Sequence, residues 1–212
     1  MKKLLNTLFP ICRSITGKGF LDSLKIIKKD IPEIKIKSFR SGKKVFDWKI
    51  PQEWNVKDAF IKNDKGKKII DFKKNNLHLV SYSTPVKNKI LSIKELKSHI
   101  HSIPTQPNVI PYITSYYKKY WGFCLDHDTK KKLFKEKNKK FIINIDTRFK
   151  KNGKMNYGEC YIEGKSKKEI LISTYLCHPS MANNELSGPI VWKYLIGYFK
   201  KKINKYSIRF VI

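Results

Sequence analysis

The chain has 212 residues, of which 41% are hydrophobic and 13% aromatic, and its formal net charge is +29. This apolar content excludes a disordered polar chain, and the length suffices for one large or two small domains that bury roughly 70% of the unfolded surface. No apolar run approaches the roughly 20 residues of a membrane helix, and the basic N-terminal stretch is interrupted by Asn6, Pro10 and Arg13. We therefore expect neither a secretory leader nor a membrane partner.

The positive charge is carried almost entirely by lysine. Of the 46 basic residues, the arginines are only Arg13, Arg40, Arg148 and Arg209. Proteins that read nucleic acids favour the planar guanidinium fork, whereas lysine enriched together with isoleucine and asparagine is typical of an A/T-rich genome. The charge therefore indicates a surface covered by lysine side chains in contact with solvent. The alternative, specific binding of a nucleic acid, has only the net charge to support it.

The four cysteines lie far apart in the sequence, at Cys12, Cys124, Cys160 and Cys177. They form no C-x-x-C pair, which argues against both a zinc knuckle and a disulfide framework. Unpaired thiols fit a reducing compartment, so we predict a cytoplasmic location.

The N-terminal forty residues predict a helix followed by a strand. In the string GFLDSLKIIKKD, Phe20, Leu24 and Ile27 recur at helical spacing, and Pro32 ends the pattern. The string EIKIKSF then alternates apolar and polar residues, as a half-buried strand does.

Residues 45–129 differ in composition from the segments that flank them. They contain short apolar stretches, many aromatic residues and turn-forming strings such as NDKGK. We expect a separate β-rich module there, with one helix at SIKELKSHI. A lysine-dense stretch, TKKKLFKEKNKK, leads into the alternating strings FIINIDTRF and MNYGECYIEG, which the turn KKNGK separates. This pattern predicts a β-hairpin.

The last fifty residues predict a βαβ unit. KKEILISTYLC is a continuous apolar run, typical of a strand buried on both faces. SGPIVWKYLIGYFKKK predicts a helix with one apolar stripe, and SIRFVI predicts a second strand. The members of the stripe are Ile190, Val191, Tyr194, Leu195, Tyr198 and Phe199. Such a unit implies a parallel pair of strands.

The loop CHPSMANNELSG, between the first of these strands and the helix, is the best candidate site. His178 follows the apolar run, at the strand end where open α/β sheets bind ligands. Glu185 supplies a carboxylate, and Asn183 and Asn184 supply amides just before a helix N-terminus. Imidazole and carboxylate together make a sensible half of a zinc site.

Five strings extend this pattern to a family resemblance: LFPICRSITGKGFLDSLKII, SGKKVFDWKIPQEWNVKDAFI, LHLVSYSTPV, IPYITSYYKKYWGFC and CHPSMANNELSGP. In this order they resemble an aminopeptidase-like zinc peptidase family associated with polysaccharide biosynthesis, in which a β-rich domain of unknown function is inserted into the peptidase fold. The resemblance covers almost the whole chain. It implies an α/β fold with a partial zinc-aminopeptidase-like (phosphorylase/hydrolase-like) sheet.

The resemblance also implies domain limits and a function. Residues 1–44 and 130–212 would belong to the peptidase-like domain, truncated at its C-terminus, and residues 45–129 to the inserted β-rich domain. The full-length protein would hydrolyse a peptide or amide bond with a zinc-activated water. The fragment alone would be inactive, and no catalytic residue is assigned within it.

The resemblance makes His178, Asn184 and Glu185 the candidate ligands of one or two zinc ions. In the family pattern A-N-D-N-x-S-G the aspartate bridges two metals, and here Asn184 stands at that position. A neutral amide offers one carbonyl oxygen and no charge, so Glu185 is the substitute that the sequence offers. This departure supports an alternative function, a non-catalytic protein that binds a glycan or an envelope precursor on the same fold.

The remaining histidines and Cys177 have simpler interpretations. His99 and His101 share a face if the chain is extended there and could chelate a metal, but a polar loop explains them as well. His127 fits a surface turn and His78 a strand. Cys177 would face the core rather than the metal.

The string SYYKKYWGF interleaves Tyr116, Tyr117, Tyr120 and Trp121 with lysines. Such side chains can stack on bases or sugars, and they can equally pack inside a β-rich domain. The sequence leaves the substrate and the oligomeric state open.

Overall fold

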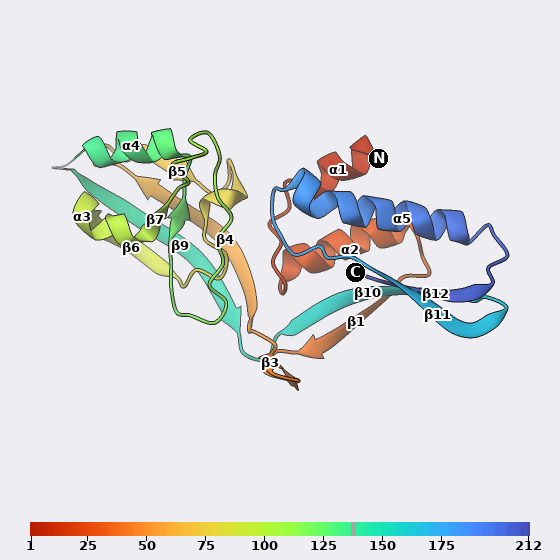
Figure 1. Cartoon of the computed structure of the whole chain (residues 1–212). Coiled ribbons are helices and arrows are strands. Elements are labelled where there is room, and N and C mark those ends of the chain that lie inside the picture. Colours follow the sequence, from red (N-terminus) through yellow and green to blue (C-terminus); the bar gives the residue numbers. More distant parts are fainter. Residues whose placement is uncertain (137–138) are drawn as a thin grey trace. The chain divides into compact units, whose positions relative to one another are not determined.

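The computed structural model describes residues 1–136 and 139–212. The chain divides into two compact units, each of which is described by itself (Figure 1): residues 1–53 with 150–212, and residues 54–149. The domain limits expected from the sequence lie at 44/45 and 129/130. The structure divides the chain later, because the strand at 140–150 is hydrogen-bonded within the sheet of the second unit.

The first unit combines helices with a four-stranded mixed sheet and the separate two-stranded sheet β2-β3. Its elements are α1 (Lys2–Leu8), α2 (Lys18–Asp30), β1 (Lys35–Arg40), β2 (Lys44–Val45), β3 (Trp48–Lys49), β10 (Lys154–Ile162), β11 (Ser166–Ser173), the π-helix η3 (Ala182–Leu186), α5 (Ser187–Phe199) and β12 (Tyr206–Val211). The strand order is β1-β10-β12-β11, with β11 and β12 parallel and the other pairs antiparallel. The predicted βαβ unit with parallel strands is confirmed.

The helices α1, α2 and α5 lie on one face of this sheet (Figure 1) and form the core with it. The core residues are Leu8, Phe20, Leu24, Ile27, Ile31, Ile34, Cys160, Leu176, Leu186, Ile190, Trp192, Ile196, Ile208, Phe210 and Ile212. The predicted stripe of α5 is right in part. Ile190 is buried and Leu195 and Phe199 pack against the core, whereas Val191, Tyr194 and Tyr198 are exposed. Trp192 and Ile196, which lie outside the predicted stripe, are also buried in the core.

The prediction that KKEILISTYLC is buried on both faces was also wrong. Within the described residues β11 is the edge strand of its sheet and most of it is exposed, including Ile170 and Leu171. An apolar run alone does not reveal whether a strand has neighbours on both sides. The chain becomes buried only at Leu176, beyond the strand.

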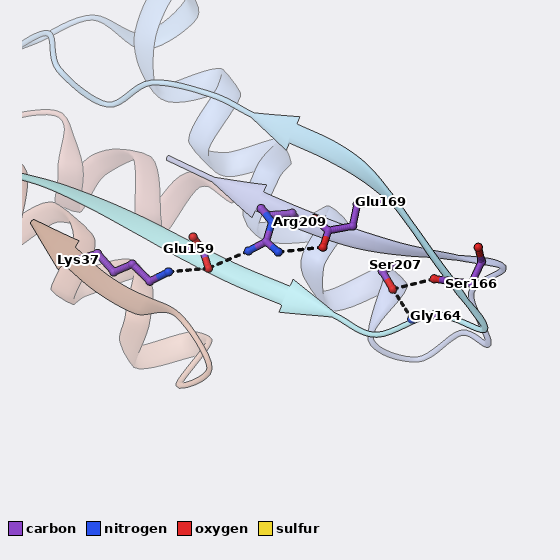
Figure 2. A network of polar contacts seen from close by, with 7 residues as sticks. All are labelled: Lys37, Glu159, Gly164, Ser166, Glu169, Ser207 and Arg209. Carbon is purple, nitrogen blue, oxygen red and sulfur yellow. Dashed lines mark hydrogen bonds and ion pairs between the residues drawn. The ribbon is translucent and has the colours of Figure 1, made fainter. Parts of the chain in front are cut away.

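A row of polar contacts fixes β11 against the sheet (Figure 2). Arg209 on β12 binds Glu169 on β11 through two N–H groups, at 2.7 and 2.9 Å, and donates to Glu159 on β10 at 3.0 Å. Lys37 on β1 donates to the same Glu159 oxygen at 2.9 Å. Bidentate arginine–carboxylate pairs are geometrically specific, so this row supports the register of the strand that leads to the candidate site.

The second unit contains a four-stranded sheet with the order β5-β4-β9-β6. Its elements are β4 (Glu53–Lys62), β5 (Lys68–Asp71), η1 (Asn76–His78), β6 (Val86–Ser92), α3 (Ile93–Leu96), η2 (Lys97–His99), β7 (Ile100–His101), β8 (Phe123–Cys124), α4 (His127–Lys135) and β9 (Lys140–Lys150). The predicted helix at SIKELKSHI corresponds to α3 with η2. The lysine-dense stretch contains most of the helix α4, which the sequence analysis missed, and its residues 137–138 lie outside the described residues.

The predicted hairpin was wrong in its pairing, although both of its strands exist. β9 lies in the sheet of the second unit and β10 in that of the first. The turn between them therefore marks the passage from one unit to the other. Alternation of apolar and polar residues identifies a strand but not its partner.

Two further expectations concern membranes and thiols. Among the helices that the structure describes, none has the length and apolar character needed to cross a membrane. All four cysteines are free thiols, in agreement with the prediction that they form no disulfide.

Gly19 in α2 gives a test of the packing that holds the N-terminal loop. A Cβ atom at Gly19 would lie 1.9 Å from the carbonyl oxygen of Cys12, whereas one at Gly197 in α5 would meet nothing within 4 Å. We expect Gly19→Ala to lower the free energy of unfolding by about 1–3 kcal/mol through overpacking, and Gly197→Ala to raise it by up to about 1 kcal/mol through helix propensity. Urea unfolding followed by circular dichroism measures both; equal effects would contradict the packing.

Candidate metal centre

The loop after β11 folds back so that two residues seven positions apart meet. The strand ends at Ser173, and the chain runs on to His178 at the start of the loop. Ser180 adopts a left-handed conformation with φ 46°, which reverses the chain and leads it into η3. The π-helical turn buries Glu185 and leaves Asn184 exposed. Such turns are frequent at functional sites.

Glu185 holds His178 with both of its carboxylate oxygens. The backbone N–H of His178 donates to Oε1 at 2.7 Å, and the ring Nδ1–H donates to Oε2 at 2.7 Å. The Glu185 side chain is 0% exposed, whereas that of His178 is 27% exposed. The carboxylate therefore fixes both the position and the ring orientation of a histidine that solvent can reach.

These contacts stabilise the protonated imidazole. The pKa of His178 is raised from 6.5 to about 10 by the side-chain hydrogen bonds of Cys177 and Glu185, against the opposing effect of burial. Cys177 Sγ lies 3.8 Å from Nδ1, and Glu185 Oε2 lies only 2.7 Å from the same atom. Nδ1 carries one proton and donates one hydrogen bond. We assign this hydrogen bond to the carboxylate of Glu185, which is the nearer acceptor.

A buried arginine of the N-terminal segment is influenced by the charge of this carboxylate. Arg13, in the loop between α1 and α2, is 0% exposed, and its Nη1 donates to the carbonyl oxygen of Leu8. Burial lowers the pKa of Arg13 to about 10, and the charge of Glu185 is the largest effect that opposes this shift. Ser180 Oγ donates to the carbonyl of Phe9 at 3.5 Å, which joins the N-terminal segment to the candidate loop.

One group of possible metal donors occurs among the described histidines, cysteines and acidic residues. It comprises Cys177, His178 and Glu185, whose ligand atoms lie within 4.8 Å of one another. Cys177 packs against the core as predicted, yet its thiol also reaches this group. Asn184 contributes a backbone contact: its carbonyl oxygen accepts a hydrogen bond from Tyr175 Oη at 3.0 Å. The Tyr175 ring meets that of His178 edge to face, with centroids 5.6 Å apart.

The other histidines form hydrogen bonds within the second unit. His99 stacks on Trp121 with ring centroids 3.6 Å apart, and His101 Nε2 lies 2.7 Å from the hydroxyl of Tyr120. His78 and His127 meet oxygen atoms of Cys124 and Ser102 at 2.9 Å. These contacts support a structural role for the four residues, although His78 lies in the 3-10 helix η1 and not in a strand, and His127 begins α4 and does not lie in a turn.

The sequence analysis missed Arg13 and Tyr175 as parts of this site. Arg13 carried a usable signal, because it is one of few arginines in a chain that otherwise uses lysine. It stands within the first of the strings that carry the family resemblance. Nothing in the sequence assigned Tyr175 to the site, because an aromatic residue in an apolar run usually packs in the protein core.

Comparison with solved structures identifies the class of fold. Over 99% of its length the chain is similar to a zinc aminopeptidase from Bacillus subtilis, with a TM-score of 0.58, 12% identity and 60% of that chain covered. It is also similar to a peptidase M28 precursor from Shewanella amazonensis, with a TM-score of 0.59, 7% identity and coverages of 99% and 62%. The predicted α/β, aminopeptidase-like fold is confirmed.

The family follows from closer relatives. Residues 2–212 match the domain of unknown function DUF4910, and the chain belongs to that family. It is 48% identical over 208 residues, 98% of this chain and 46% of the relative, to a Clostridium acetobutylicum protein named for polysaccharide biosynthesis and an aminopeptidase-like domain. A crystal structure named as a peptidase from that organism gives a TM-score of 0.91 at 47% identity, with coverages of 99% and 48%. The chain thus spans about half the length of these relatives.

The raised pKa of His178 predicts how stability depends on pH in the metal-free protein. Because the folded state binds the proton more tightly than the unfolded chain, its contribution is fully present below pH 6.5 and is lost as the pH rises towards about 10. We expect the difference in free energy of unfolding between wild type and His178→Gln to shrink over this range. Urea unfolding at a series of pH values measures it, and a constant difference would contradict the assignment.

Proposed function

We propose that this chain supplies one part of the metal centre of a zinc-dependent, aminopeptidase-like hydrolase, with His178 as the zinc ligand. The observation that carries the proposal is the buried Glu185 carboxylate, which engages the backbone and the ring of one partly exposed histidine. The similarity to zinc aminopeptidases supports the choice of metal.

The donor set fits zinc. Histidines that bind metals typically donate their other ring N–H to a carboxylate, which fixes the tautomer and raises the basicity of the ligand. With Nδ1 bound to Glu185, coordination goes through Nε2. Direct coordination by Glu185 and Asn184, as expected from the sequence, stays a prediction, and Cys177 is a further candidate donor because its thiol belongs to the same group.

When bound, zinc lowers the pKa of a water ligand to about 7 and polarises a carbonyl group. The substrate class that fits is a peptide or another amide. The residues of this chain hold the ion: His178 binds it and Glu185 orients His178. Because the chain spans about half of its relatives, hydrolysis is proposed for the whole protein, and its free thiols support a reducing, cytoplasmic setting.

Zinc titration followed by NMR tests the proposed ligand. The chain has five histidines, and His178→Gln identifies the ring signal that belongs to His178. We expect zinc to shift this signal first, and we expect His178→Gln to weaken zinc binding by at least about tenfold, since it removes a direct ligand.

His101→Gln in the second unit is the matched control, because it removes an imidazole that contacts Tyr120 rather than the candidate loop. It should leave zinc affinity within about twofold of wild type. A zinc-induced shift confined to the histidines of the second unit would contradict the proposal.

The rival function is a non-catalytic binding protein for a glycan or an envelope precursor. It is favoured by Asn184, whose side chain is exposed at the position of the expected bridging aspartate. Zinc bound at His178 without any release of amino acids from short peptides by the whole protein would favour this rival. Release that a chelator abolishes would favour the hydrolase.

A further inference from the structure

Arg13 presents an electrostatic problem that its one hydrogen bond does not solve. Its guanidinium is fully buried, and in residues 1–136 and 139–212 no acceptor lies within hydrogen-bonding distance of Nε or Nη2. Guanidinium stays charged under all ordinary conditions, so a buried arginine requires a compensating anion. The buried carboxylate of Glu185 has the same requirement, which the His178 ring meets only while that ring is protonated.

The N-terminal segment, which carries Arg13, packs against the element that carries Glu185. Helix α1 packs against η3, the turn that carries Glu185. Arg13 Nη1 is bound to Leu8 at the end of α1, and Phe9 accepts the hydrogen bond from Ser180 of the candidate loop. The charge of Glu185 favours the charged form of Arg13 and raises its pKa against the effect of burial.

We propose that Arg13 is a positioning residue: its buried guanidinium is the counter-charge that holds the Glu185 carboxylate on His178. The N-terminal loop is then part of the site without touching the metal. The predicted effect of Arg13 on zinc binding rests on the proposed function. The predicted effect of Arg13 on the hydrogen bonds of His178 does not.

A simpler role for Arg13 is capping, since Leu8 is the last residue of α1 and basic side chains often bind the last carbonyls of a helix. Two substitutions separate the roles. Arg13→Lys keeps the positive charge, and Arg13→Gln keeps a side-chain donor for Leu8 without the charge. Arg209→Gln is the matched control, because Arg209 also binds carboxylates but on the strands β10 and β11.

The first measurement needs no metal: it is the NMR signal and the solvent exchange of the His178 Nδ1 proton, which Glu185 protects. We expect Arg13→Gln to speed exchange by at least about tenfold, and Arg13→Lys and Arg209→Gln to stay within about threefold of wild type. If Arg13→Gln exchanges like wild type, the positioning role is wrong. If Arg13→Lys and Arg13→Gln are equally impaired, capping geometry rather than charge is responsible.

The second measurement is zinc affinity in a double-mutant cycle. We expect Arg13→Gln to weaken zinc binding about 10- to 100-fold, as loss of an outer-shell partner does, but by less than about threefold in a Glu185→Gln background. Equal losses in both backgrounds would overturn the coupling. If Arg13→Gln does not fold, the double variant Arg13→Gln with Glu185→Gln is tested for folding. Recovery of folding in the double variant supports the role of Arg13 as counter-charge to Glu185, and failure to recover contradicts that role.

Zinc that leaves the His178 signal of wild type unshifted would overturn the proposed function. The exchange measurement would then still support or contradict the role of Arg13. The two proposals can therefore fail separately.

Discussion

The candidate site depends on one interaction: a buried carboxylate accepts hydrogen bonds from two N–H groups of a single histidine. Removing a carboxylate from water is costly, and the cost is offset only when its oxygens are hydrogen-bonded and its charge is balanced. Glu185 meets the first condition through the backbone and the ring of His178. Hydrogen bonds to charged groups each contribute about 1.5–3 kcal/mol, which is enough to define one conformation of the loop.

The rest of the first unit holds the two ends of this loop in place. At one end, β11 pairs in parallel with β12 and is bound sideways through Glu169 and Arg209. At the other end, η3 passes directly into α5, whose Trp192 and Ile196 are buried in the core. Because strand and helix are both anchored, the reversal at Ser180 joins two fixed points. The site therefore belongs to the fold rather than to a free loop.

The sequence predicted the parts of this arrangement that depend on local pattern. The helical spacing of α2, the parallel pairing of β11 and β12, and the position of His178 and Glu185 in one loop after β11 all follow from periodicity, order and residue type. The free thiols followed from the spacing of the cysteines, whereas the aminopeptidase-like fold followed from the family resemblance of five strings.

The sequence could not predict what depends on packing between distant segments. Exposure of β11 depends on which strands flank it, and the pairing of β9 depends on strands far away in the sequence. The orientation of Glu185 towards His178, rather than towards solvent, depends on the π-helical turn. The burial of Arg13 and the contact of α1 with that turn join the N-terminal segment to residues far away in the sequence.

The most direct test of the account is a crystal structure of the zinc-loaded protein with anomalous diffraction data collected at the zinc edge. We predict an anomalous peak about 2.0–2.1 Å from His178 Nε2, with Glu185 still accepting the Nδ1 hydrogen bond. A zinc ion bound through Nδ1, or no zinc at this loop, would contradict it.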